Sequence, residues 1–307
     1  MKAAVRPAVD AAPALRVRSV LFAFYELTKP RIVVLLLVTT VPAMILADRG
    51  APSLWLVAAT LIGGTLSAGG ANAINQYLDR DIDEVMTRTR RRPLPAQVIP
   101  PAAAVVFGVG LGVAGFVWLL AFVNLPAALL SASALAFYVF VYTLWLKRSS
   151  PQNIVIGGAA GAAPALVGWA AVTGRVAWPA VVLFAIVFLW TPPHFWALSL
   201  RYERDYRMAG VPMLPVVAGL EATTRSILRY SVVLALTSLA LWPVAHTGLI
   251  YPVVAVALGA AFVARAVHLR RSRTVTAAMS LFRYSIVYLA LLFGAVALDT
   301  LVRFGPS

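Results

Sequence analysis

The strongest constraint on this chain is a series of long apolar runs that follow one another along its whole length. A helix that crosses the roughly 30 Å hydrocarbon core of a bilayer needs about 20 apolar residues. Runs of that length are separated by short breaks rich in charged residues, proline or glycine, and they do not alternate as barrel strands do. We therefore predict an all-α fold, a polytopic transmembrane bundle of nine helices, at residues 31–48, 53–78, 101–121, 125–146, 153–172, 177–200, 227–245, 249–267 and 280–302.

The composition agrees with a membrane protein and excludes several other classes. Of 307 residues, 61% are hydrophobic and 12% charged, whereas soluble domains carry about 25% charged residues. An ordinary soluble enzyme, a disordered protein and a soluble nucleic-acid binder are therefore excluded, and we expect no nucleic-acid partner. The chain has no cysteine, which excludes disulfides, thiolate metal sites and cysteine nucleophiles.

The basic residues predict how the bundle is oriented. All but three of the 26 Lys and Arg flank the same ends of the predicted spans, and only Arg49, Arg175 and Arg303 lie on the other side. Because cytoplasmic loops carry the excess of Lys and Arg, we expect a cytoplasmic N-terminus and an external C-terminus in a plasma membrane. We interpret residues 1–24 as a cytoplasmic tail, with an organellar transit peptide as the alternative, and residues 25–307 as one transmembrane domain.

The scarce acidic residues carry more functional information than the basic ones. Six of the eleven fall in two short stretches, residues 79–84 and 203–205, both at predicted cytoplasmic helix ends. Asn75, Asp79 and Asp83 are spaced by four residues, so one helix would place them on one face. Carboxylate and amide oxygens suit Mg²⁺. The alternative is a solvated helix end, although stacked Asp79 and Asp83 would repel each other without a counter-ion.

Arginines close to these acids suggest the rest of the ligand. Arg88 and Arg92 follow the first stretch, and guanidinium groups suit phosphate oxygens. Asp205 in the second stretch offers a further oxygen ligand for the same cation. Carboxylates, Mg²⁺ and arginines together indicate a diphosphate substrate bound at the cytoplasmic face.

These motifs resemble those of a known family. The stretch from Asn75 to Leu94 resembles the first aspartate motif of the UbiA-type intramembrane prenyltransferases. Residues 27–31, 147–158 and 191–215 resemble the branch of that superfamily whose members farnesylate haem, and the resemblance spans roughly residues 24–303. Many members carry a second acid where this chain has Ala209, and the haem branch shares this departure.

The resemblance implies a reaction and a set of site residues. It implies transfer of the farnesyl group of farnesyl diphosphate to a vinyl group of haem B, with addition of water, to give haem O and diphosphate. Haem B is then a substrate and Mg²⁺ the cofactor, and haem A synthase or a terminal oxidase is a possible downstream partner. The catalytic, Mg²⁺-binding residues implied are Asn75, Asp79, Asp83 and Asp205, and the diphosphate-binding residues are Arg88, Arg92, Lys147 and Arg148.

His194 is the one histidine inside a predicted span near these motifs. Ionisable residues at membrane depth are often functional, and this side chain could contact haem iron. The alternative is a hydrogen-bonded core histidine beside the Pro192–Pro193 pair. Its sequence position leaves both interpretations open.

Two other functions fit parts of the pattern. The same fold could act on a different ring acceptor, such as a quinone precursor or a chlorophyll-type ring. A haem or lipid transporter is the third hypothesis. Transport sites usually lie near the bilayer midplane, whereas these acids lie at helix ends, so the sequence favours an enzyme.

Overall fold

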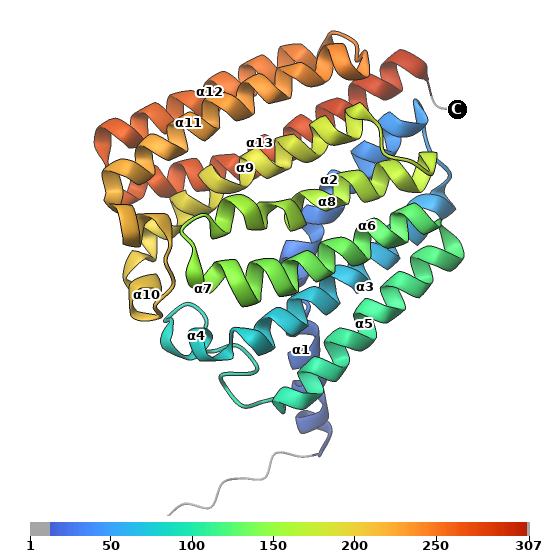
Figure 1. Cartoon of the computed structure of the whole chain (residues 1–307). Helices are drawn as coiled ribbons and strands as arrows, with labels where there is room; N and C mark the ends of the chain where they lie inside the picture. The colour runs from blue at the N-terminus through green and yellow to red at the C-terminus, as the bar shows by residue number, and fades with distance from the viewer. Residues whose placement is uncertain (1–12, 306–307) are drawn as a thin grey trace, which may run out of the picture.

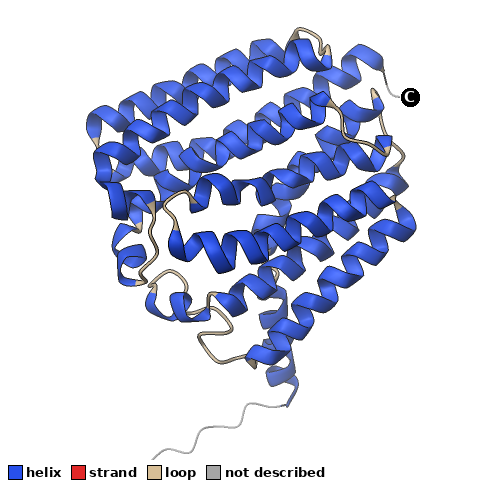
Figure 2. Cartoon of the chain, in the orientation of Figure 1, coloured by secondary structure: helices blue, strands red, loops and turns tan. Residues whose placement is uncertain are grey.

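Helices account for nearly all of the described chain. The computed structural model describes residues 13–305, although the side chains of residues 13–19, 32 and 35–37 are not described, and this part of the chain contains no strand (Figure 2). The elements in chain order are α1 (Pro13–Leu27), α2 (Pro30–Asp48), α3 (Leu54–Leu78), α4 (Arg80–Val85), α5 (Pro101–Phe122), α6 (Leu125–Ala136), the π-helix η1 (Phe137–Leu146), α7 (Lys147–Ser149), α8 (Asn153–Thr173), α9 (Trp178–Arg201), α10 (Glu203–Met208), α11 (Leu214–Ala245), α12 (Ile250–Ser272) and α13 (Val275–Phe304).

Eight helical segments of the described chain are long and apolar enough to cross a membrane. They are α3, α5, the continuous segment Leu125–Ser149, α8, α9, α11, α12 and α13. Helix α2 coincides with the predicted span at 31–48, and within it Val38–Asp48 forms a shorter apolar helix. The all-helical, multi-span fold is thus confirmed, while the count of nine spans and the orientation of the termini stay predictions.

The long helices lie side by side and run along a common direction (Figure 1). Helix α3 packs closely on α5, α9 packs on both α8 and α11, and α12 lies between α11 and α13. The short helices α4, α7 and α10 lie at one end of this bundle (Figure 1). We call this end the α4–α10 end; it is where both acidic stretches are found.

The pair α3 and α5 makes the closest helix contact relevant to that end. A methyl group at Gly70 would lie 2.5 Å from the backbone oxygen of Gly108 and 2.7 Å from the backbone nitrogen of Gly112. Only a residue without a side chain fits at that distance, as is common where membrane helices pack closely. Helix α3 is therefore held directly against the backbone of α5.

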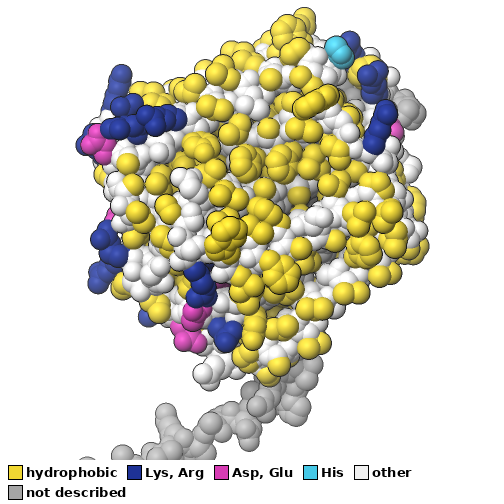
Figure 3. All heavy atoms as spheres, in the orientation of Figure 1, with side chains coloured by type: hydrophobic (Ala, Val, Ile, Leu, Met, Phe, Trp, Pro, Cys, Tyr) yellow, Lys and Arg dark blue, Asp and Glu magenta, His cyan; other side chains and the backbone are white. Residues whose placement is uncertain are grey.

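The outer surface of the bundle is mostly apolar, as expected for a protein surrounded by lipid. Hydrophobic side chains cover the middle of the face seen in Figure 3, and charged side chains gather toward its two ends. Large apolar side chains such as Val106 and Leu236 are well exposed on the long helices. An exposed apolar band of this kind is what lipid contact requires.

One local expectation needs correction, and the expected tail is described only in part. The helix expected to run through Asn75 and Asp83 is interrupted at Asp79, which ends α3 and precedes the short helix α4. The expected tail at residues 1–24 is helical from Pro13, where α1 begins, and residues 1–12 lie outside the described part of the chain.

Candidate functional site

The first acidic stretch keeps its four-residue spacing across the helix break. Asp79 has φ −93° and ψ 4°, close enough to helical geometry for the hydrogen-bond ladder to continue. Its N–H donates to the Asn75 carbonyl at 2.9 Å, and the Asp83 N–H donates to the Asp79 carbonyl at 2.8 Å. Both carboxylates are buried. The break therefore turns the chain without separating the three polar side chains.

Basic side chains provide the counter-ions that two stacked carboxylates require. Lys147 Nζ donates to Asp79 Oδ2 at 2.5 Å, across 68 residues of sequence. Arg92 Nη1 donates to both oxygens of Asp83, at 2.9 and 2.7 Å. Asn75 Nδ2 also donates to Asp79 Oδ2, at 2.7 Å. The structure thus brings together five of the predicted residues, each acid with a basic partner.

Lys29 joins this group and was missed by sequence reasoning. Its Nζ donates to Asn75 Oδ1 at 2.6 Å. Burial, together with the nearby Arg92 guanidinium, lowers the pKa of Lys29 to about 7. Lys29 lies inside the 27–31 stretch that resembles the family. It was not singled out, because a lysine just before an apolar run usually only indicates the orientation of the span.

The second acidic stretch is attached to the first through a hydroxyl group. Thr87 Oγ1 donates to the Asp205 carboxylate and lies 2.8 Å from Oδ1 and 2.6 Å from Oδ2. The backbone nitrogen of Arg88 also donates to Asp205 Oδ2, at 3.4 Å. Thr87 and Asp205 are 118 positions apart in sequence. No sequence signal marks Thr87, because a threonine in a basic loop is common. The contact joins Asp205 to the segment that directly follows the first acidic stretch.

An apolar cluster fixes the same junction. The side chains of α4, the start of α8 and the α10–α11 segment pack together there; they are Ile82, Met86, Ile154, Tyr206, Val211 and Met213. Tyr202 packs against the edge of this cluster. The polar contact between Thr87 and Asp205 is therefore supported by buried apolar side chains from both halves of the chain.

Two of the predicted diphosphate-binding residues point elsewhere. Arg148 donates to both oxygens of Asp81, each at 2.7 Å, near the surface, and this hydrogen bonding lowers the pKa of Asp81 to about 2. The Arg88 guanidinium lies over the Tyr202 ring, 5.7 Å from its centroid. The structure does not bring either guanidinium to Asp79 or Asp83.

His194 lies in the interface between α9 and α13. Its ring is stacked between Trp190 and Phe282, with centroids 4.2 and 4.6 Å away, and Nδ1 is 2.6 Å from Ser285 Oγ. The residue is buried. These contacts are those of a hydrogen-bonded core histidine, and none involves an acidic side chain of the site.

The donor atoms can be tested against the predicted Mg²⁺. Within residues 13–305, no group of three or more His, Cys, Asp or Glu side chains lies close enough to hold a metal, so the four predicted ligands do not surround one point in this structure. Asp79 Oδ1, however, is fully buried and has no hydrogen-bond partner among the described residues. Carboxylate and amide oxygens are ligands that Mg²⁺ prefers. The donor chemistry therefore fits the ion.

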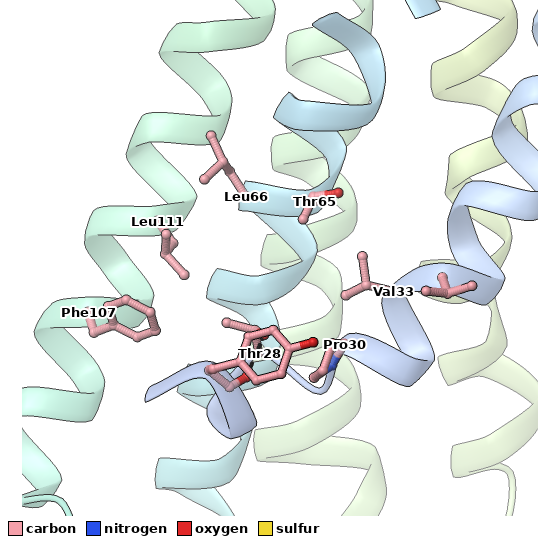
Figure 4. A pocket seen from close by; sticks show the side chains of 9 residues that line it. Thr28, Pro30, Val33, Thr65, Leu66, Phe107 and Leu111 are labelled. Carbon is pink, nitrogen blue, oxygen red and sulfur yellow. Dashed lines mark hydrogen bonds between the residues drawn. The ribbon is translucent and has the colours of Figure 1, made fainter. Parts of the chain in front are cut away.

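An apolar pocket of about 410 Å³ lies near this site but does not form part of it. It is bounded by α1, α2, α3 and α5, with Thr28 and Pro30 on one side and Leu66 and Phe107 on another (Figure 4). Leu66 precedes Asn75 by two and a half turns, about half a rotation, so the two side chains lie on opposite sides of α3. No acidic residue of either stretch lines the pocket.

Known proteins are similar to this chain over most of its length. A protein named protoheme IX farnesyltransferase from Parafrankia sp. (strain EAN1pec) is 58% identical over 283 residues, covering 91% of this chain and 90% of the relative. A protein of the same name from Frankia alni is 57% identical, covering 91% of this chain and 98% of the relative.

Solved structures share the fold at much lower identity. One from a study of digeranylgeranylglyceryl phosphate synthase has a TM-score of 0.76 at 19% identity, covering 92% of this chain and 99% of that one. A UbiA homolog from Archaeoglobus fulgidus bound to GPP and Mg²⁺ has a TM-score of 0.60 at 16% identity, covering 90% and 99%. The model of the UbiA prenyltransferase family matches residues 36–295. This chain belongs to the UbiA prenyltransferase family.

Proposed function

We propose that this chain transfers the farnesyl group of farnesyl diphosphate to a vinyl group of haem B, with addition of water, to give haem O and diphosphate. The observation that carries the proposal is the convergence of Lys29, Arg92 and Lys147 on the acidic stretch that Thr87 connects to Asp205. Relatives more than half identical over nearly the whole chain bear the name of this activity.

The basic side chains have a direct role in breaking the bond to diphosphate. As the allylic carbon separates from oxygen, negative charge grows on the leaving group, and stabilising such charge is usually the largest catalytic contribution. Lys147 and Arg92 are already held at the site by their carboxylate partners. A diphosphate that enters the site provides further oxygen atoms, to which Lys147, Arg92 and Lys29 can donate hydrogen bonds.

Mg²⁺, when bound, supplies the remaining neutralisation of the diphosphate. The residues that would hold it are Asn75, Asp79, Asp83 and Asp205. The unpartnered Asp79 Oδ1 is the oxygen available for this role. We place the site at the cytoplasmic face of a plasma membrane, since the surrounding loops carry the excess of basic residues.

Product analysis tests the proposal directly. Membranes containing the chain are incubated with haem B, farnesyl diphosphate and Mg²⁺, and the extracted haems are examined by mass spectrometry. We expect a product with the mass of haem B plus one farnesyl group and one hydroxyl group, the second proton of the water being released, and no such product from Asp79→Ala. A quinone precursor and a chlorophyll-type ring are offered in parallel incubations. Prenylation of one of these in place of haem, or movement of haem without any covalent product, would contradict the assignment.

A further inference from the structure

Two arginines whose guanidinium groups bind no carboxylate of the acidic stretches share one aromatic ring. The guanidinium carbons of Arg88 and Arg201 each lie 5.7 Å from the centroid of Tyr202. Both arginines are exposed, and among the described residues neither forms an ion pair with a carboxylate, in contrast to Arg92, Arg148 and Arg207. A ring face attracts a cation but does not cancel its charge. The pair therefore holds two uncompensated positive charges.

A buried apolar cluster supports the aromatic ring that these two charges share. Tyr202 packs against the cluster that contains Met86 and Tyr206, at the junction where Thr87 meets Asp205. A ligand that paired with both guanidinium groups would carry two separate anionic groups at one edge. Farnesyl diphosphate fits poorly, because its two charged groups are contiguous and its cations are already provided by Lys29, Arg92 and Lys147.

We propose that Arg88, Tyr202 and Arg201 form a subsite that binds the two propionate carboxylates of the tetrapyrrole acceptor. The inference rests on the proposed function and adds to it the residues that recognise the acceptor. Haem B carries both propionates on one edge and its vinyl groups away from that edge. Guanidinium groups bind carboxylates with two parallel hydrogen bonds, which fixes direction as well as position. Binding the propionate edge at Arg88 and Arg201 turns the vinyl side of the ring away from solvent.

The subsite also accounts for selection of the acceptor. A ring without carboxylates leaves both arginines unpaired, whereas haem B provides one anionic group for each. Specificity for polar groups of this kind is stronger than specificity for apolar shape. The assignment moves Arg88 from the diphosphate, where the sequence placed it, to the acceptor.

The test compares two tetrapyrroles that differ only in their carboxylates. The purified full-length chain is titrated with haem B and with its dimethyl ester, and binding is followed by the shift of the Soret band. We expect Arg201→Gln to weaken haem B binding by about tenfold or more, the usual effect of losing a charged hydrogen bond, and to leave ester binding unchanged. Arg88→Gln should behave alike, and Arg201→Lys should recover part of the affinity.

Matched controls separate this subsite from its neighbours. Arg204→Gln removes an exposed arginine of the same segment that does not lie over the Tyr202 ring, and it should bind both tetrapyrroles like the parent chain. Binding of a non-reactive farnesyl diphosphate analogue should be the same in Arg201→Gln as in the parent.

Several results would overturn the assignment. Equal weakening for haem B and its ester would show that the carboxylates are not recognised there. Weakened binding of the diphosphate analogue with unchanged haem binding would return both arginines to the diphosphate. If the parent chain bound no haem while binding the diphosphate analogue, the proposed acceptor itself would be wrong, and the subsite with it.

Discussion

The two acidic stretches are held by different chemistry, although they form one site. In the first, Asp79 and Asp83 are each bound by a cation, Lys147 and Arg92. In the second, Asp205 is bound by the Thr87 hydroxyl and a backbone N–H. A hydroxyl satisfies the carboxylate's hydrogen-bonding capacity without cancelling its charge.

This difference indicates how the site accepts its ligands. Asp79 and Asp83 each already have a basic partner, so an entering cation must replace Lys147 or Arg92 unless an anion binds at the same time and draws them away. In the second stretch Asp205 has no basic side-chain partner among the described residues, whereas its exposed neighbour Glu203 pairs with Arg207. We therefore expect the two stretches to respond differently when a partner is removed, and the following variants test that difference.

The largest effect is expected when the first stretch loses an acid. Asp79→Ala removes the unpartnered oxygen and the partner of Lys147, and we expect product formation to fall by about 10²–10³-fold or more, as for loss of a principal electrostatic group. The measurement is the initial rate of farnesyl transfer. Asp81→Asn is the matched control because that acid lies at the surface with Arg148. A similar fall in the control would show that charge at this end, and not Asp79 itself, is what matters.

Removing a cation from the first stretch should affect folding. Arg92→Met leaves the buried Asp83 without its counter-ion, and breaking a buried pair in this way costs about 3–5 kcal/mol of unfolding free energy. Denaturant unfolding in mixed micelles measures the loss. Arg92→Met combined with Asp83→Asn should recover most of the stability. Failure of the second substitution to recover it would mean that Arg92 acts through packing.

The second stretch should respond to a smaller change. Thr87→Val keeps the shape of the side chain and removes the hydroxyl, which leaves Asp205 without its side-chain partner. A loss of about 1–3 kcal/mol is usual when a buried acceptor loses its donor, so kcat/KM for farnesyl diphosphate should fall by about tenfold. Thr87→Ser, which retains the hydroxyl, should be close to the parent. Equal defects in both variants would exclude the hydrogen bond as the cause.

The smallest effect concerns the exposed pair of Asp81 and Arg148. Because Arg148 lowers the pKa of Asp81 to about 2, the stabilisation is present above the ordinary aspartate value near 4 and is lost only as the pH falls through about 2. Asp81→Asn should therefore change stability by less than about 1 kcal/mol. Thermal unfolding from pH 5 to 8 should show the same small difference throughout. A difference that grows within that range would contradict the assignment of Asp81 as charged.

Much of the fold followed from the length of the apolar runs, because the bilayer thickness fixes the length of a spanning helix. The helix α9, for example, covers Trp178–Arg201 where a span at 177–200 was predicted. Helix α1 was missed because its segment, Pro13–Leu27, has no apolar run long enough to predict a span. The start of α11 was missed for a similar reason: it begins at Leu214, and Gly219 interrupts its helical backbone with φ 77°.

The site was predictable where the chemistry is local. Asn75, Asp79 and Asp83 share one side because their spacing is a property of the helix, and the local break at Asp79 does not change it. Pairings between distant segments were not predictable. Lys147 was expected on the diphosphate, but its contact with Asp79 depends on how η1 packs against α3. The contact between Thr87 and Asp205 depends on how α4 and α10 meet, which no pattern in either segment specifies.

The contact between α3 and α5 determines how precisely the side chain of Asn75 is positioned. Gly70 lies against the backbone of α5, and Asn75 follows only five residues later on the same rigid helix. Where two helices touch through their backbones, no flexible side chain lies between them that could move aside. The position of α3 along α5 is therefore fixed closely at Gly70. The 2.6 Å hydrogen bond from Lys29 to Asn75 depends on that position of α3. A single methyl group added at Gly70 would therefore displace the end of α3 that carries Asn75.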